Sequence, residues 1–394
     1  MSKLWTKNNQ QVLDPLVEAY TVGNDYLLDQ ELIPYDVQGS LAHAAMLQKI
    51  GILTGKELSA LKKGLQTILT KWKQGAFTIK PEDEDGHTAI ELFLTKSCGE
   101  AGKKIHTGRS RNDQILVTIR LFSKDAVKHV TTLTKNLQTL LEKLARTYAQ
   151  TPMSGYTHMQ PAMPSTVGMW LGSFADSAAD TMTLLKTVAV ILDQNPLGSV
   201  ASFGEQTLHL DRDFTTKQLH FKKTQRNPMY CAYSRGKFEL LTLQAMSHIM
   251  LDLSKLASDL MRFTMKEFSF FDLPPVFKTG SSVMPQKQNF DIFEIVRGNY
   301  AIFTGYETQI RTTIANLPSG YNRDFQLTKE PYLKAIKLVK DSLIITNHTM
   351  QHLIVKKTNL AKACTPELDM ADQAYALVKK GQSFRDAYRD LKES

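Results

Sequence analysis

Several features that mark whole classes of protein are scarce in this chain of 394 residues. Its three cysteines, Cys98, Cys231 and Cys364, lie far apart. An odd number of separated cysteines argues against a disulfide framework and favours a reducing compartment. The first residues contain no apolar run of the kind found in a secretory signal peptide. We therefore expect a cytoplasmic protein.

Long apolar runs and long runs of one charge are also missing. No segment approaches the roughly 20 apolar residues that a spanning helix needs, so we expect no membrane association. The net charge is +9, but no run of five or six lysines and arginines occurs. No zinc-finger or RNA-binding signature accompanies this charge, which argues against nucleic acid as a partner. The basic balance is compatible with an anionic small-molecule substrate.

Motifs for cofactors are absent as well. The chain has neither a His-Glu-x-x-His pattern nor a cysteine pair, so no metal site is expected. It has no phosphate-binding Gly-x-x-x-x-Gly-Lys loop, and the segment 198–204 lacks the Gly-x-Gly-x-x-Gly pattern. We expect no cofactor.

Prolines are sparse, and the stretches without them are helical in pattern. None occurs between residues 81 and 152, 228 and 274, or 285 and 318. Apolar residues at spacings of three and four within these stretches predict long helices. The fold is therefore predicted to be all-α, and helices of this length favour a bundle. We expect shorter helices in residues 1–111, a central long-helix domain in 112–357 and a short C-terminal helical domain in 358–394.

The most distinctive segment is 279–291, Thr-Gly-Ser-Ser-Val-Met-Pro-Gln-Lys-Gln-Asn-Phe-Asp. It carries hydroxyls, free backbone N–H groups and one lysine, and a helical pattern follows it. A polar loop that leads into a helix N-terminus is suited to binding and covering an anion. Composition alone, however, favours an ordinary surface loop.

Four segments, in order along the chain, together resemble one known family. They are 104–114 (Lys-Ile-His-Thr-Gly-Arg-Ser-Arg-Asn-Asp-Gln), 155–161 (Gly-Tyr-Thr-His-Met-Gln-Pro), the loop 279–291, and 320–331 (Gly-Tyr-Asn-Arg-Asp-Phe-Gln-Leu-Thr-Lys-Glu-Pro). In these segments the chain resembles the argininosuccinate lyase family of the fumarase/aspartase superfamily. The resemblance implies a three-domain helical fold, a homotetramer with active sites shared among three chains, and cofactor-free β-elimination of argininosuccinate to arginine and fumarate.

The resemblance also implies catalytic residues. Ser281 matches the family's catalytic serine and is our candidate base, although Ser282 beside it is not excluded. Lys287 and the loop N–H groups would stabilise the serine alkoxide. His158 matches a histidine that shares the acid–base work, and Glu294 matches the glutamate that polarises it. Whether His158 protonates the leaving group or assists Ser281 stays open.

Further matches imply contacts to the substrate. Ser110, Arg111 and Asn112 match contacts to a substrate carboxylate, although this segment also reads as a helix cap with Asn112 or Asp113 as the N-cap. The other matched contacts are Thr157, Lys287 and Asn289 for the fumarate portion, Tyr321, Gln326 and Lys329 for the arginine portion, and His87 and, more weakly, Asp25 from the first domain.

The chain departs from the family pattern in three regions. Near the N-terminus the family commonly has a serine contact, and the nearest aligned residue here is Asp25. Gln288 and Phe290 stand where the family has lysine and proline, which is expected to affect closure of the loop. The chain also ends at Ser394, whereas the family generally continues for several more helices. Gln288, Phe290 and the short C-terminal part support one alternative, a catalytically silent crystallin-like homologue. A second alternative is another superfamily lyase that acts on a different fumarate adduct.

Overall fold

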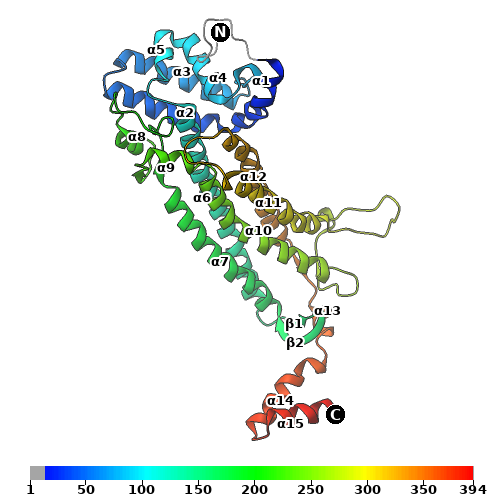
Figure 1. Cartoon of the computed structure of the whole chain (residues 1–394). Helices are drawn as coiled ribbons and strands as arrows, with labels where there is room; N and C mark the ends of the chain where they lie inside the picture. Colours follow the sequence, from blue (N-terminus) through cyan, green and yellow to red (C-terminus); the bar gives the residue numbers. More distant parts are fainter. Residues whose placement is uncertain (1–13, 394) are drawn as a thin grey trace. The chain divides into compact units, whose positions relative to one another are not determined.

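Helices dominate the structure, a computed structural model that describes residues 14–393 (Figure 1). The long helices are α2 (Asp25–Lys49), α3 (Gly55–Lys73), α6 (Arg111–Thr147), α7 (Val167–Leu192), α10 (Lys237–Phe263), α11 (Asp291–Ala315) and α12 (Lys329–Met350). The shorter α-helices are α1 (Pro15–Val22), α4 (Gly86–Cys98), α5 (Glu100–Lys104), α8 (Arg212–Gln218), α9 (Pro228–Tyr233), α13 (Lys357–Lys362), α14 (Met370–Lys379) and α15 (Phe384–Glu393). The 3₁₀ helices are η1 (Pro81–Asp83), η2 (Pro275–Phe277), η3 (Arg323–Thr328) and η4 (Pro366–Asp369).

Three of the long helices follow the distribution of prolines, whereas α2 contains Pro34 in its interior. The proline-free stretches contain α6, which ends before Pro152, α10, and α11, which ends before Pro318. These three helices were predicted, and the structure confirms them. No helix of the described chain has the length and apolar character of a membrane span.

The described chain forms two compact units, and each is built from three separate segments. The first unit holds residues 14–128, 187–243 and 306–336, and the second holds 129–186, 244–305 and 337–393. This grouping follows contacts in space, whereas the predicted boundaries at 111 and 357 follow sequence pattern. Those boundaries stay a prediction.

The first unit has a core of aliphatic side chains from α2, α3 and α4, which lie together at the start of the described chain (Figure 1). Leu61, Leu65 and Leu94 are completely buried in it. Helix α3 begins in a capping box, in which Thr54 and Glu57 each bind the other's backbone N–H. Truncating one of the buried leucines to alanine would cost about 2–5 kcal/mol. This core fixes the ends of α2 and α4 that line the site described below.

Short strands accompany the helices. In the second unit β1 (Pro152–Thr157) and β2 (Gln160–Thr166) form an antiparallel hairpin, and β5 (Phe271–Asp272) pairs with β6 (Ile354–Val355). In the first unit β3 (Gln194–Asn195) pairs in parallel with β4 (Lys223–Thr224). The hairpin carries His158 in its turn, so a strand pair that the helical pattern did not predict positions a candidate catalytic residue.

Candidate active site

A pocket in the first unit collects charged side chains from segments that lie far apart in the sequence. It is lined by Val22, Asp25, Asp29, Glu84, Asp85, His87, Arg111, Asn112, Ile115, Arg235, Tyr321, Arg323, Gln326 and Lys329. Four of these residues are acidic, and four are lysine or arginine. Such a lining suits a ligand that carries both positive and negative groups.

Lys329 lies at the centre of an acidic cluster in this pocket. Its ammonium is 2.6 Å from a carboxylate oxygen of Asp29 and 3.1 Å from one of Asp25. The two aspartates are one turn apart on α2, so their side chains share a face. Burial works against a charged lysine, but Asp29 and Asp25 outweigh it and raise the pKa of Lys329. Burial raises the pKa of Asp25, and the negative charge of Asp29 raises it as well.

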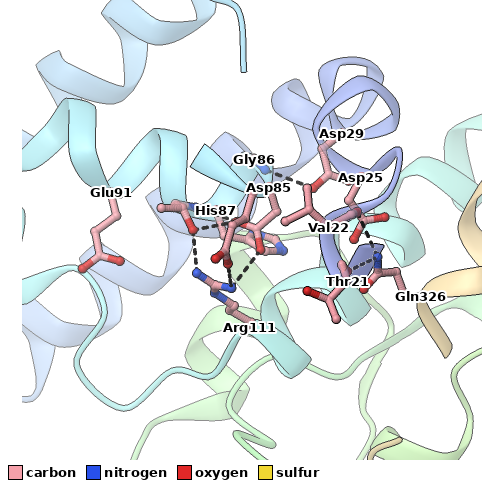
Figure 2. Close-up of polar contacts among 12 residues, drawn as sticks. Thr21, Val22, Asp25, Asp29, Asp85, Gly86, His87, Glu91, Arg111 and Gln326 are labelled. Atoms are coloured by element: carbon pink, nitrogen blue, oxygen red, sulfur yellow. Dashed lines mark hydrogen bonds and ion pairs between the residues drawn. The ribbon is translucent and has the colours of Figure 1, made fainter. Parts of the chain in front are cut away.

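The N-terminus of α4 packs closely against α2 beside this cluster. The side chain of Asp85 caps α4 by accepting a hydrogen bond from the backbone N–H of Thr88 at 2.8 Å. The N–H of Gly86 donates to Asp29 at 3.0 Å (Figure 2). A Cβ on Gly86 would lie only 3.3 Å from the Cβ of Asp29, so glycine permits this close approach.

Arg111, the first residue of α6, is held by the acidic segment before α4. Its Nη1 donates to Glu84 at 2.7 Å, and its Nη2 donates to the Thr88 hydroxyl at 2.8 Å. Nη1 also lies 3.5 Å from Asp85 (Figure 2). Burial opposes the charge of Arg111, but Asp85 and Glu84 together raise its pKa.

The cap of α6 differs from the prediction. The Ser110 hydroxyl accepts from the Asn112 N–H at 3.2 Å, and the Asp113 carboxylate accepts from the Ser110 N–H at 2.9 Å. Ser110 is therefore the N-cap, and the expectation of Asn112 or Asp113 was wrong. The pair forms a reciprocal cap, which leaves the Asn112 side chain at the pocket wall.

The segment around η3 closes the pocket on another side. The Gln326 amide donates to the backbone carbonyls of Thr21 and Val22, both at 3.1 Å (Figure 2). These carbonyls belong to the last turn of α1, where the backbone C=O groups have no N–H partner within the helix. The guanidinium carbon of Arg235 lies 5.9 Å from the centre of the Tyr321 ring. Asp25, His87, Arg111, Asn112, Tyr321, Gln326 and Lys329 thus line one pocket, and Ser110 caps the helix that begins at its edge.

The other candidate residues lie in the second unit. The loop 279–291 is closed at its base by paired backbone hydrogen bonds between Thr279 and Asn289, at 3.1 and 2.9 Å. Inside the loop, the Ser281 hydroxyl oxygen accepts from the N–H groups of Val283 and Met284, at 3.3 and 3.1 Å. The Lys287 side chain is exposed. Two N–H donors therefore already face the oxygen on which an alkoxide would form.

His158 occupies the turn of the β1–β2 hairpin, next to Thr157. Both turn residues, His158 and Met159, have positive φ values of 51° and 64°. This left-handed conformation is unfavourable for bulky side chains, and it places an exposed histidine at the hairpin tip. Glu294 is exposed on the first turns of α11. Within residues 14–393, no hydrogen bond or ion pair joins Ser281, His158 and Glu294 to one another.

Comparisons with known proteins identify the family. A family model described as "Lyase" matches residues 9–303. An argininosuccinate lyase from Thermotoga neapolitana is 42% identical over 391 residues, which cover 99% of this chain and 98% of that protein. The chain belongs to the argininosuccinate lyase family. A second member, from Parabacteroides distasonis, is 40% identical over 99% of this chain and 86% of its own length.

Solved structures show the same fold as this argininosuccinate lyase family member. An EDDS lyase in complex with formate superposes with a TM-score of 0.81 at 24% identity, over 97% of this chain and 76% of that one. A fumarate lyase (delta crystallin) from Brucella melitensis gives a TM-score of 0.78 at 18% identity, over 96% and 91% of the two chains. The predicted all-α, fumarase/aspartase-like fold is thereby confirmed.

Sequence reasoning missed several residues that line the pocket: Asp29, Glu84, Asp85, Arg235 and Arg323. The spacing of Asp29 from Asp25, four residues on a predicted helix, was a usable signal for one of them. Arg235 lies in a short connection between α9 and α10 and carried no local signal. Phe290, which stands where the family has proline, packs against two neighbours. Its ring stacks on that of Phe293 with the ring centres 6.0 Å apart, and the Lys278 ammonium lies 5.6 Å from the centre of the Phe290 ring.

Proposed function

We propose that this protein catalyses the reversible β-elimination of argininosuccinate to L-arginine and fumarate. One observation carries the proposal: residues from two separate segments of the family pattern, 104–114 and 320–331, line a single pocket with charges of both signs, together with Asp25 and His87. Argininosuccinate carries carboxylates, an ammonium and a guanidinium group, so it needs partners of both signs. The identity of 42% to a family member over 99% of the chain supports the same assignment.

The reaction removes a proton from a carbon next to a succinyl carboxylate and then breaks the C–N bond on the neighbouring carbon. The electron pair of the C–H bond forms the double bond of fumarate, and the leaving guanidino nitrogen takes a proton. We propose Ser281 as the base. The N–H groups of Val283 and Met284, together with the charge of Lys287, would stabilise its alkoxide.

We propose that His158, oriented by Glu294, supplies the second proton-transfer group. Both side chains are exposed in the single chain and are therefore accessible to substrate and to a neighbouring subunit. The left-handed turn that presents His158 is costly locally, and such strain is often found where a side chain must be aimed.

We assign the pocket in the first unit to the arginine portion and one carboxylate of the substrate. Asp25, Tyr321, Gln326 and Lys329 would bind the amino-acid end, and Ser110, Arg111, Asn112 and His87 would bind a carboxylate. Thr157, Lys287 and Asn289 would bind the fumarate portion. Arg111 holds Glu84 and Thr88 through one N–H of each terminal nitrogen, and because a guanidinium has five N–H donors, others remain for a substrate carboxylate.

We further propose a cytoplasmic homotetramer with shared active sites and no cofactor, acting on a small molecule without nucleic-acid or membrane partners. The exposure of Ser282, Lys287, His158 and Glu294 on one chain supports the sharing of sites. The three-domain division at residues 111 and 357 belongs to this proposal.

The direct test is to incubate the purified protein with argininosuccinate and follow fumarate by its absorbance. Turnover should fall at least 1,000-fold in Ser281→Ala while substrate binding stays within a few fold, because the lost group acts on the proton and not on affinity. Ser282→Ala, in the same loop, is the matched control and should stay within tenfold of wild type.

Two results would contradict the proposal. Fumarate released from an aspartate or adenylosuccinate-like substrate, but not from argininosuccinate, would favour another superfamily lyase. No fumarate from any such adduct, by protein that still binds argininosuccinate, would favour the catalytically silent homologue.

A further inference from the structure

Behind the pocket wall, a buried aspartate holds the one pocket histidine. We infer that Asp36 is a positioning residue for His87: it binds Nδ1 of His87 and so leaves Nε2–H to donate to a carboxylate oxygen of the ligand. This inference rests on the proposed function and adds to it a residue that none of the family motifs discussed above contains.

The contact is part of the packing of α4 on α2. Asp36 on α2 and His87 on α4 are both buried, 3% and 7% exposed. A carboxylate oxygen of Asp36 is hydrogen-bonded to Nδ1 of His87. Nε2 of the same ring is buried and has no hydrogen-bond partner among the described residues. Because His87 lines the pocket, Nε2 is the ring nitrogen that remains available to bind a ligand.

Asp36 is itself held from the other side. Its second carboxylate oxygen accepts from the Ser40 hydroxyl at 3.2 Å, and Ser40 accepts from Nη1 of Arg109 at 3.0 Å. Both oxygens of Asp36 are therefore engaged, and its orientation is fixed before any ligand binds. Because Ser40 fixes the Asp36 carboxylate, the carboxylate in turn fixes the orientation of the His87 ring.

The hydrogen bond decides which nitrogen carries a proton. A carboxylate only accepts, so Nδ1 must be protonated. Nε2 then donates when the ring is cationic and only accepts when the ring is neutral. The pocket must favour the cation for His87 to bind a carboxylate.

The charged groups around His87 act in both directions. Asp36 and Asp29 on α2 and Asp85 before α4 favour the cation. His106 opposes it when protonated, and Arg111, which lines the same pocket at the start of α6, carries the same sign of charge, as does Arg109. Burial also opposes the cation, but the carboxylates outweigh it and raise the pKa of His87. Among these groups Asp36 makes the largest contribution that favours the cation.

The test compares binding of fumarate and of arginine, each alone, by calorimetry between pH 5.5 and 8.5. Asp36→Asn keeps the shape and removes the charge. We expect it to weaken binding of one of the two ligands about 10- to 100-fold at pH 8, the range for loss of a charge-assisted hydrogen bond. The loss should shrink towards pH 5.5, where the unassisted ring becomes protonated. The ligand that responds identifies which carboxylate His87 binds.

A double-variant cycle separates positioning from a general structural role. In a His87→Gln background, Asp36→Asn should have little further effect on binding, because the group it positions is gone. Asp193→Asn, which removes a carboxylate bound to Lys124 elsewhere in the same unit, is the control and should leave binding unchanged. Additive losses, or a loss in Asp36→Asn that does not vary with pH, would overturn the inference.

A second measurement does not depend on whether Asp36→Asn folds. In ¹⁵N-histidine-labelled wild-type protein, the signal of His87, assigned by its absence from His87→Gln, should show both nitrogens protonated at pH 7 and Nε2 should shift with one of the two ligands. A neutral ring, or no shift with either ligand, would overturn the inference. Wild-type protein that shows the shift but releases no fumarate from argininosuccinate would instead contradict only the proposed function.

Discussion

Lys329→Met should destabilise the protein far more than loss of any exposed lysine on the same helix. The Lys329 ammonium lies 2.6 Å from Asp29 and 3.1 Å from Asp25, and its side chain is 3% exposed. Methionine fills much of the same volume but carries no charge. The variant therefore leaves the buried carboxylate of Asp29 and the partly buried carboxylate of Asp25 side by side with no lysine between them.

The structure sets the size of the effect. Removing one partner of a buried ion pair costs about 3–5 kcal/mol, because the remaining charge is left uncompensated. Asp29 keeps the N–H of Gly86 at 3.0 Å, so Asp25 is the less well supported of the two. We expect a loss of about 3–5 kcal/mol at pH 7.5, of which Asp25→Asn in the same protein should restore about half.

The pH dependence has a definite sign. Without the ammonium, the folded-state pKa of Asp25, already raised above 3.8, rises further. The folded state then binds more protons than the unfolded state between 3.8 and that pKa, so stability increases as pH falls. The loss caused by Lys329→Met should be smaller at pH 5 than at pH 7.5.

Urea unfolding monitored by circular dichroism measures the effect, provided that the slope against urea is unchanged. Lys334→Met is the matched control on α12. Its ammonium lies 2.6 Å from Glu330, but its side chain is 53% exposed, and an exposed pair of this kind contributes about 0.5 kcal/mol or less. Equal losses for the two variants, or a Lys329→Met loss that is the same at pH 5 and 7.5, would refute the reasoning from buried charge.

Three further predictions concern the site, the acid range and the assembly. Arg111→Lys, which cannot span Glu84 and Thr88 with one fork, should lower kcat/KM about tenfold or more in the fumarate assay; a change under twofold would remove Arg111 from the binding groups. Burial and Arg109 lower the pKa of His106 to about 4, so the unfolding free energy should fall as pH drops from 6.5 to 4. His106→Asn should lessen that fall by about 1–2 kcal/mol in urea titrations at each pH, and an identical profile would contradict the assignment. Mixing Ser281→Ala with His158→Asn chains should restore part of the activity if sites are shared, whereas no recovery would favour sites built from one chain.

Local pattern determined most of the helical architecture. Because proline ends helices and apolar residues at spacings of three and four mark a buried face, the sequence alone places α6, α10 and α11. The same locality made the motif loop 279–291 recognisable. It did not reveal the hairpin at 152–166, since its turn is formed by His158 and Met159 in a conformation that neither residue favours. The pairing of β1 with β2 imposes that turn.

The pocket, by contrast, was decided by the tertiary structure. Lys329 is bound to Asp29, 300 residues earlier in the chain, and His87 is held by Asp36 through the packing of α4 on α2. Lys329 and His87 were expected from the family resemblance, but their partners Asp29 and Asp36 were not, because a charge gives little local sign of its future partner. The sequence by itself determined where several of the long helices lie and which segments carry reactive groups. Only the tertiary structure decided which charged groups are buried next to one another. This shared burial shifts their pKa values and forms the pocket.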